Sequence, residues 1–296
     1  MSQAKDWVLL ANFQDFTLMT NAIAMKAAQK LGMPYTNTII PVDLTLNGEY
    51  RGSYMLTQQV EVHENRINVG PDGVLLEMDA LYDEPFKFMS AGLQLPVMFK
   101  YPANPSAQQF QDVKADFDNL GRAIVMNSYD EGEKLFDRQQ VVNYILLNSL
   151  VGCYEIKHPK SVFIHKAIGG KYMLGPVWDF DWAFGYNEKT LSYFGNPEQP
   201  LLVSNDSGPG AKFLNGLLKN PETKKLFKKT WQDFKVQHFN ELLQYVETYA
   251  ARIRVSKQKD FAIWKNGSGN LPQLKADMKT YLHKRSNHLD AYVKGW

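Results

Sequence analysis

The stretch Gly175-Pro-Val-Trp-Asp-Phe-Asp-Trp-Ala-Phe-Gly-Tyr186 places two carboxylates, Asp179 and Asp181, directly after a run that is typical of a buried strand. Two apolar runs, 161–166 and 171–178, flank Gly169-Gly170. A Gly-Gly pair between two such runs is typical of a two-residue hairpin turn. The sequence therefore predicts a β-hairpin over 161–178, and we expect the chemistry of the protein to lie at its open end.

The register of this hairpin follows from its turn. If Gly169 and Gly170 are the two turn residues, Lys160 lies opposite Asp179, with Cα atoms about 4.5 to 7 Å apart. Pro176 cannot donate to a ladder and prefers an edge or a bulge, so a slip of about one residue is allowed. A cation is thus expected to face a carboxylate at the mouth of the hairpin.

The composition is that of a globular protein, and the 296 residues are enough for one large domain or two closely packed ones. The 33 basic and 31 acidic residues leave a net charge of +2, which gives no broad basic field and argues against nucleic acid as a partner. The lone Cys153 excludes an internal disulfide and a cysteine-rich zinc site. No run of about 18 apolar residues exists, so no transmembrane segment is expected.

The N-terminus gives no information on localisation. Residues 1–6 lead almost straight into Trp7-Val-Leu-Leu10, without a signal peptide. A domain rarely opens so abruptly, so we expect a trimmed start, and the compartment is unknown from the sequence.

The first 103 residues predict an N-terminal α+β lobe built on an antiparallel sheet. Apolar residues recur every four positions from Met19 to Leu31, which predicts a helix that Gly32 and Pro34 end. The pair Asn47-Gly48 is the strongest signal for a two-residue hairpin turn. The extended runs of this lobe are 7–13, 38–46, 51–58, 74–78 and 95–101.

Residues 104–296 predict a mainly helical C-terminal lobe that carries the 161–178 hairpin. Asp137 is a good N-cap for a helix over 141–150, which Gly152 ends. Residues 186–210 are rich in Gly, Pro and Asn and predict a long loop, which in a compact domain is usually functional or mobile. From residue 211 the spacing of apolar residues is helical, so the predicted fold class is α+β.

Three motifs in this order resemble the CotH family, which is named for a spore-coat protein and regarded as a group of atypical, kinase-like enzymes. They are Asn47-Gly-Glu-Tyr-Arg-Gly-Ser-Tyr54, His158-Pro-Lys-Ser161 and Pro176-Val-Trp-Asp-Phe-Asp-Trp-Ala-Phe-Gly185, and the resemblance covers most of the chain. It implies a two-lobed, kinase-like fold that transfers the γ-phosphate of ATP to a protein hydroxyl with Mg or Mn. It also implies an exported or cell-surface protein, with a protein substrate or a coat or surface partner.

The resemblance assigns the metal of ATP to Asp179, the first Asp of Trp-Asp-x-Asp. Asp181 is expected as a second ligand or as a partner that orients the loop. Carboxylates that hold a divalent metal and cations that hold phosphates are what phosphoryl transfer requires. The alternative is structural, since Asp side chains also cap turns by accepting backbone N–H bonds.

Glu155 best matches the position at which the family carries an Asp that acts as catalytic base. Lys160 is the best candidate for a phosphate contact or a salt bridge, and Ser161 lies near the position of a metal-holding Asn. A Glu reaches one methylene further than an Asp, and a misplacement of about 1 Å can cost two orders of magnitude in rate. Without the resemblance, a surface glutamate is the expected reading of Glu155.

Two further residues complete the predicted nucleotide and phosphate site. Gln58 stands where the family often has a Glu, and Arg51 is expected to project from its hairpin toward a ligand. Thr20 stands where an Arg is frequent, and a basic strand that normally precedes Trp7 is absent. Gln58 cannot form a charge-assisted ion pair, which is the stronger kind of contact.

These departures leave two alternatives to an active kinase. The first is a kinase-like protein that has lost catalysis and works in binding or surface assembly, and nucleotide binding in the presence of metal would separate the two. The second is a carbohydrate-active protein, which requires an acid and a base about 5 to 10 Å apart across an open cleft. Aromatic residues near the carboxylates are expected to lie mostly in the core, although an exposed pair can stack on adenine or a sugar. A zinc site that joins His158 and His165 is not expected, because a Pro and a strand separate them.

Overall fold

The computed structural model describes residues 4–200 and 208–296. Within these residues the chain forms eight α-helices and two antiparallel sheets, so the predicted α+β class is confirmed. The helices are α1 (Thr20–Lys30), α2 (Ala107–Val125), α3 (Asp130–Leu135), α4 (Arg138–Val151), α5 (Pro209–Leu218), α6 (Pro221–Gln237), α7 (Phe239–Trp264) and α8 (Leu271–Lys294). No helix among the described residues is long and apolar enough to cross a membrane.

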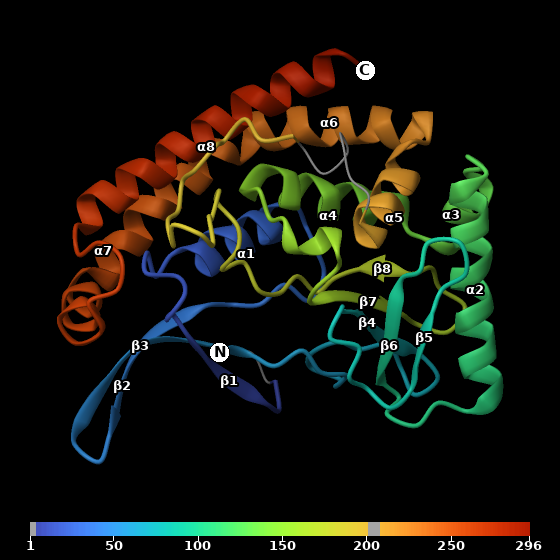
Figure 1. Cartoon of the computed structure of the whole chain (residues 1–296), viewed down its shortest axis with the longest axis horizontal. Coiled ribbons are helices and arrows are strands. Elements are labelled where there is room, and N and C mark those ends of the chain that lie inside the picture. Colours follow the sequence, from blue (N-terminus) through green and yellow to red (C-terminus); the bar gives the residue numbers. More distant parts are fainter. Residues whose placement is uncertain (1–3, 201–207) are drawn as a thin grey trace.

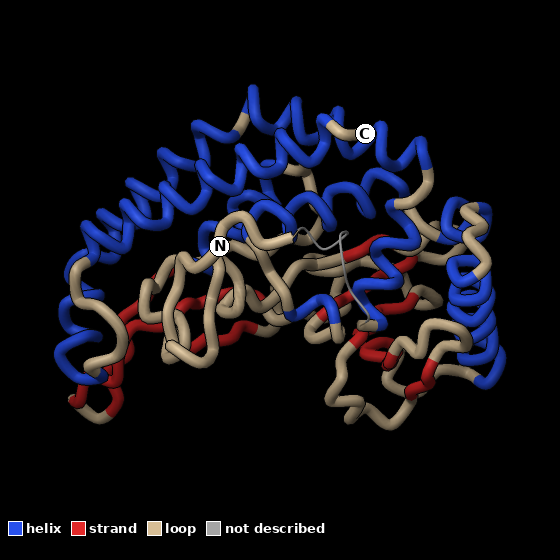
Figure 2. Tube along the Cα trace, turned by 45° about the horizontal axis from the view of Figure 1, so that its top comes forward, coloured by secondary structure: helices blue, strands red, loops and turns tan. Residues whose placement is uncertain are grey.

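The two sheets divide the strands unequally. The three-stranded sheet has the order β1 (Trp7–Ala11), β3 (Glu49–Gln58), β2 (Ile40–Leu46). The five-stranded sheet has the order β5 (Lys87–Met89), β6 (Pro96–Tyr101), β4 (Val74–Met78), β7 (Val162–Lys166), β8 (Met173–Leu174). The helices α6 and α8 lie above α1 and α4, α7 descends along the left side toward β3, and both sheets lie below α1 and α4 (Figure 1). A second view shows the helices as an arc along one side of the molecule and the strands beneath it (Figure 2).

One hydrophobic cluster joins these layers. It includes the fully buried Ile23 of α1, Leu76 of β4, Leu242 of α7 and Leu282 of α8. The central helix α4 is buried continuously over 141–151, which is the pattern of a helix surrounded by protein on all sides. The elements that carry the site described below are therefore held by a single core.

The hairpin of β2 and β3 forms as predicted. Asn47 and Gly48 both have positive φ, 51° and 81°, and they connect Leu46 to its cross-strand partner Glu49. Positive φ at both central residues is the requirement that Asn-Gly meets in a two-residue turn. Further along, Tyr50 pairs with Thr45 and Gly52 with Leu44, so Arg51 is the extra residue of a β-bulge.

The central hairpin also forms, and its register differs by one residue from the count based on Gly169 and Gly170, which is within the slip that Pro176 was expected to allow. Ile164 pairs with Leu174 and His165 with Met173. The turn is closed by the Gly170 N–H, which donates to the Ala167 carbonyl at 3.0 Å, so Ile168 and Gly169 are its central residues. Gly169 has φ +69°, which explains why a glycine is required there.

The second strand of this hairpin is shorter than predicted, and Asp179 does not lie in a ladder opposite Lys160. Strand β8 ends at Leu174, two residues before Pro176, which cannot donate a ladder bond. Just before β8, the Tyr172 N–H donates to the Leu135 carbonyl, and the Tyr172 carbonyl accepts the Asp137 N–H, so Tyr172 does not bond to β7. The carboxylates therefore follow the strand as part of a loop.

Strand β7 pairs with β4 on its other edge, from Val74–Lys166 to Met78–Val162. The five-stranded sheet thus contains strands from both sides of residue 103, where the sequence places the boundary between lobes. The division into 1–103 and 104–296 stays a prediction. Of the predicted loop 186–210, residues 201–207 lie outside the described residues, and α5 already begins at Pro209.

Candidate functional site

Three carboxylates meet where the loop after β8 passes the end of α4. Ligand oxygens of Glu155, Asp179 and Asp181 all lie within 4.8 Å of one another. Glu155 belongs to a short 3-10 helix, η1 (Glu155–Lys157), which follows Gly152. Gly152 ends α4 in the left-handed conformation, with φ 65° and ψ 45°, and so turns the chain toward the two aspartates. The structure thus brings together three of the predicted site residues.

The loop that carries the aspartates is fixed by residues from the N-terminal part of the chain. Asp179 has φ +60°, an uncommon conformation for a residue other than glycine. The next residue, Phe180, donates its N–H to Oδ1 of the buried Asn21 at 2.9 Å. The carbonyl of Asp181 accepts a hydrogen bond from the Tyr193 hydroxyl. Asn21 was not predicted as a site residue, and nothing in its local sequence indicates that it reaches a loop 159 positions away.

The carboxylates are held close enough to disturb each other's ionisation. Burial raises the pKa of Asp181 to about 8, and the charge and hydrogen bond of Asp179 contribute to the shift. Burial also raises the pKa of Glu155, followed by the charge of Asp179, although Lys160 opposes the change. Like charges packed this closely favour a shared proton or a bound cation.

Glu155 is the most buried of the three, with 2% of its surface exposed. Its Oε1 accepts a hydrogen bond from Lys160 Nζ at 3.1 Å. Its Oε2 is buried and has no hydrogen-bond partner among the described residues. A buried carboxylate oxygen without a partner calls for a ligand, and three carboxylates are a donor set that suits Mg²⁺ or Mn²⁺.

Lys160 is the cation that contacts this cluster in the described part of the chain. Its ammonium lies 5.8 Å from the centre of the Trp182 ring, and 38% of its side chain is exposed. Burial lowers the pKa of Lys160, but the hydrogen bond and charge of Glu155 outweigh that effect, and the net pKa is raised. Lys160 therefore stays charged and combines the predicted salt bridge with access to solvent.

Ser161 is placed by a residue that the sequence did not single out. Its N–H donates to Oδ2 of Asp79 at 3.0 Å, and Ser161 itself has φ +52°. The neighbouring Ala80 N–H donates to the Pro159 carbonyl at 2.9 Å. Asp79, only 5% exposed, thus anchors the segment that carries Lys160. One indication of this role was present in the sequence, since Asp79 directly follows strand β4 and carboxylates at the ends of strands often belong to functional sites.

Gln58 and Arg51, predicted as nucleotide-binding residues, lie in strand β3 of the three-stranded sheet. Gln58 is 5% exposed, and its Oε1 accepts the Thr38 N–H at 3.0 Å, so it supports the local backbone. Arg51 forms an exposed ion pair with Glu49 at 2.6 Å and lines a separate cavity near α7. Their predicted role at the nucleotide stays a prediction.

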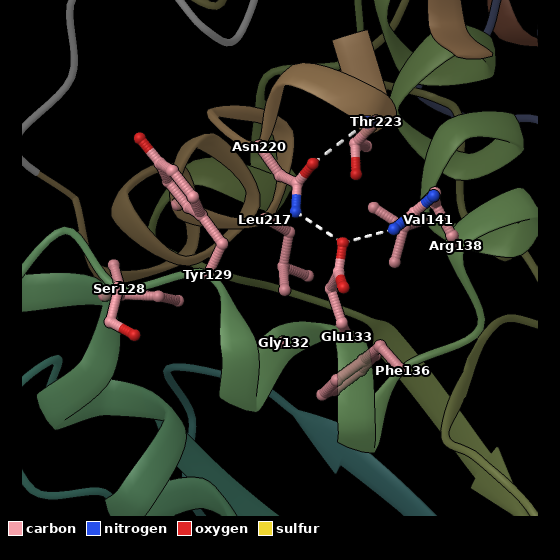
Figure 3. A pocket seen from close by; sticks show the side chains of 12 residues that line it. Ser128, Tyr129, Gly132, Glu133, Phe136, Arg138, Val141, Leu217, Asn220 and Thr223 are labelled. Atoms are coloured by element: carbon pink, nitrogen blue, oxygen red, sulfur yellow. Dashed lines mark hydrogen bonds and ion pairs between the residues drawn. The ribbon is translucent and has the colours of Figure 1, made fainter. Parts of the chain in front are cut away.

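Two cavities differ in what they can hold. A cavity of 420 Å³ has Tyr154, Trp182 and Tyr186 among its lining residues, and none of the three carboxylates lines it, although Tyr154 and Trp182 are the sequence neighbours of Glu155 and Asp181. The cavity in Figure 3, where Glu133 accepts a hydrogen bond from Asn220, encloses only 20 Å³. That is about the space of one water molecule, so the second cavity is a feature of helix packing.

The chain as a whole matches a family model. The model described as CotH kinase protein matches residues 1–294 of the 296-residue chain. No curated protein matches it. The match covers all three carboxylates of the cluster, of which Asp179 and Asp181 lie in the motif 176–185.

Proposed function

The chain belongs to the CotH kinase family, and from this membership we propose that it is a metal-dependent phosphotransferase that moves the γ-phosphate of ATP to a protein hydroxyl. The observation that supports this most directly is the carboxylate cluster, whose oxygens lie within 4.8 Å and include the unpartnered Oε2 of Glu155. Phosphoryl transfer demands little covalent work from a protein, and positioning and charge compensation account for most of the catalysis.

The two aspartates are proposed to hold Mg²⁺ or Mn²⁺. A divalent ion bound there would neutralise negative charge on the phosphates of ATP. Asp179 and Asp181 are partly exposed, whereas Glu155 is sealed behind them, so the aspartates are the ligands that a metal–nucleotide complex meets first. Burial and then the charge of Asp179 raise the pKa of Asp181, and a divalent ion beside these carboxylates would favour their ionised form.

Lys160 is proposed to contact a phosphate while it holds Glu155. Its side chain is half in solvent and half over Trp182, so the ammonium can turn from the carboxylate toward an anion without leaving the site. Ser161 follows it on a backbone that Asp79 fixes, which keeps this segment in place during binding. Pre-organisation of this kind reduces the entropy that a bound substrate must lose.

Glu155 has two proposed uses, and its burial favours one of them. As a catalytic base it must accept a proton from the acceptor hydroxyl through Oε2, which is closed to solvent. As a third carboxylate of the ion site it needs no such access. We therefore assign Glu155 to the ion site, and the role of base stays a prediction that requires the loop after β8 to move.

The test is transfer from labelled ATP, in the presence of Mn²⁺ or Mg²⁺, to the protein itself and to a library of peptides with Ser, Thr or Tyr. Asp179→Asn is expected to abolish transfer and metal-dependent nucleotide binding. Asp130→Asn, which neutralises an exposed carboxylate in α3, is the matched control and should leave both unchanged. Transfer that persists in Asp179→Asn would overturn the proposal.

A binding or assembly protein of the same fold is the second candidate, and one observation favours it. Gln58 is engaged with the Thr38 backbone, and Arg51 with Glu49, so two of the expected nucleotide contacts have other partners. This candidate predicts metal binding by the cluster without phosphate transfer. Isothermal titration with Mn²⁺ and with Mn²⁺–ATP distinguishes the two, because only the kinase requires the nucleotide to bind.

A carbohydrate hydrolase is disfavoured by the spacing of the acids. Paired glycosidase carboxylates stand about 5 Å or more apart so that a sugar fits between them. The three carboxylates here lie within 4.8 Å of one another, and Asp179 and Asp181 share a hydrogen bond. Such closeness suits a common cation.

A further inference from the structure

A further cavity, which none of the three clustered carboxylates lines, lies between strand β3 and the C-terminal end of α7. We call it the β3–α7 cavity. It measures 130 Å³, and its principal lining residues are Asn12, Phe13, Arg51, Ser53, Asp260 and Trp264. Two of these, Arg51 and Ser53, belong to the motif 47–54, which the proposed phosphotransfer does not use.

The wall of this cavity depends on a close approach of α7 to β3. Gly52 has φ +117°, and a Cβ placed there would lie 2.7 Å from Trp264 Nε1 and 3.0 Å from Asp260 Oδ1. Only glycine therefore permits both the backbone conformation and the contact. Asp260 Oδ1 accepts the Ser53 N–H at 2.8 Å, and Asn12 Nδ2 donates to the Ser53 carbonyl at 3.0 Å. The polar groups are thus fixed in place by the fold.

Two buried oxygens at this cavity have no partner. Asn12 and Ser53 are 5% and 3% exposed, and neither Asn12 Oδ1 nor Ser53 Oγ has a hydrogen-bond partner in the described part of the chain. Buried polar atoms are nearly always satisfied, so these two indicate that something else bonds there. The amide oxygen of Asn12 accepts a hydrogen bond, and the hydroxyl of Ser53 both donates and accepts one. A ligand hydroxyl group can satisfy either of them.

The rim of the cavity is aromatic and unusually exposed. Trp264 is 50% exposed and Phe13 is 71% exposed, and their rings meet edge to face with centroids 6.4 Å apart. Large aromatic side chains left in solvent beside convergent polar groups are the usual composition of a small-ligand site. They offer apolar faces on which the C–H face of a ring can pack.

The charges at the cavity select against an ion. Arg51 and Asp260 bring one positive and one negative group, so a cationic or an anionic ligand would meet a like charge. Arg51 Nη2 pairs with Glu49, and Asp260 Oδ1 accepts the Ser53 N–H. Ligand hydroxyls would therefore meet the other guanidinium N–H groups and the second carboxylate oxygen. We propose that the β3–α7 cavity binds a neutral, hydroxyl-rich ring, namely one sugar residue of a glycan. This inference is independent of phosphate transfer.

The test uses the full chain and methyl glycosides of glucose, galactose, mannose and N-acetylglucosamine as probes. Saturation-transfer NMR identifies a bound glycoside, and a titration that follows chemical shifts gives its affinity. Trp264→Ala is expected to weaken binding about 10-fold or more, because the stacking face is lost. Ile263→Ala removes an exposed neighbour on the same helix that does not line the cavity, so it should bind like the parent protein.

Ser53→Ala separates a binding role from a structural one. Since Ser53 Oγ has no partner, its removal should leave the unfolding temperature unchanged while it weakens the glycoside about 5-fold. The proposal is overturned if no glycoside binds the parent protein at tens of millimolar, or if Trp264→Ala binds as well as Ile263→Ala. Binding of a peptide at this cavity, in place of every glycoside, would equally overturn it. Metal and ATP binding, measured on Trp264→Ala, should match the parent protein.

Discussion

The replacement Asp181→Asn should stabilise the metal-free protein, although it removes a proposed metal ligand. The pKa of Asp181 is raised from 3.8 to about 8, chiefly by burial. A carboxyl whose folded pKa is raised contributes stability that is fully present below pH 3.8 and is lost as the pH rises toward about 8. At about 1.4 kcal/mol per pKa unit, the cost at pH 7 reaches about 4 kcal/mol.

Only part of this cost will be recovered by the substitution, because the asparagine stays buried and loses the hydrogen bond that the carboxyl of Asp181 shares with Asp179. We expect the free energy of unfolding at pH 7 to rise by about 2 to 4 kcal/mol in Asp181→Asn. The gain should shrink toward pH 4, where the parent carboxyl is protonated in the native state. Urea unfolding followed by circular dichroism from pH 4 to 8.5, with a chelator present, measures both effects.

Added metal should reverse the order of stability. Mn²⁺ at saturating concentration is expected to stabilise the parent protein and to have little effect on Asp181→Asn, since the variant lacks one anionic ligand. Asp118→Asn is a matched control of opposite sign, because Asp118 accepts the Ala91 N–H at 2.7 Å and pairs with Lys114. Its pKa is lowered by these partners despite burial, so its neutralisation should destabilise the protein. A metal-free Asp181→Asn less stable than the parent at pH 7 would refute the reasoning.

Three further predictions test the fold around the site. His165 donates from Nδ1 to the Gly175 carbonyl, and burial lowers the pKa of His165. As the pH is lowered through about 6.5, the free energy of unfolding should therefore decrease by up to about 1.4 kcal/mol per pH unit. Unfolding curves of His165→Gln should lack this pH dependence. The buried Arg285 donates to three carbonyls, and Arg285→Met should cost about 3 kcal/mol, seen as a lower urea midpoint at unchanged slope. Gly52→Ala should cost about 1 to 3 kcal/mol through its positive φ and should shift the fluorescence of Trp264, whereas an unaltered spectrum would contradict the contact.

Local features of the fold could be predicted from the sequence because neighbouring residues determine them. Asp137 caps α4 as expected, where its side chain accepts the Gln140 N–H at 2.8 Å. The turn at Asn47-Gly48 forms as predicted, and both of its residues have positive φ. The hairpin at Gly169-Gly170 was predicted, but its turn is centred on Ile168 and Gly169, which shifts the register by one residue, within the slip that was allowed.

The site required information that no local pattern carries. Glu155, Asp179 and Asp181 were predicted, and their meeting within 4.8 Å agrees with one shared function. Asn21 and Asp79 were missed, since their roles depend on hydrogen bonds to residues 159 and 82 positions away. The bulge at Arg51, which brings this residue to the cavity beside α7, was not predicted, and its role at the nucleotide stays a prediction.

The distribution of unfavourable features argues that the cluster has been kept for use. Ser161, Asp179 and Phe184 adopt left-handed backbone conformations within one segment, and each costs of order 1 kcal/mol or more. The same segment carries a carboxyl with a pKa near 8 and faces an unpartnered buried oxygen of Glu155. A scaffold that had lost its ligands would gain stability by replacing any of these, as the Asp181→Asn argument shows. Strain, buried charge and unsatisfied polarity therefore coincide at the place where we propose that a cation binds.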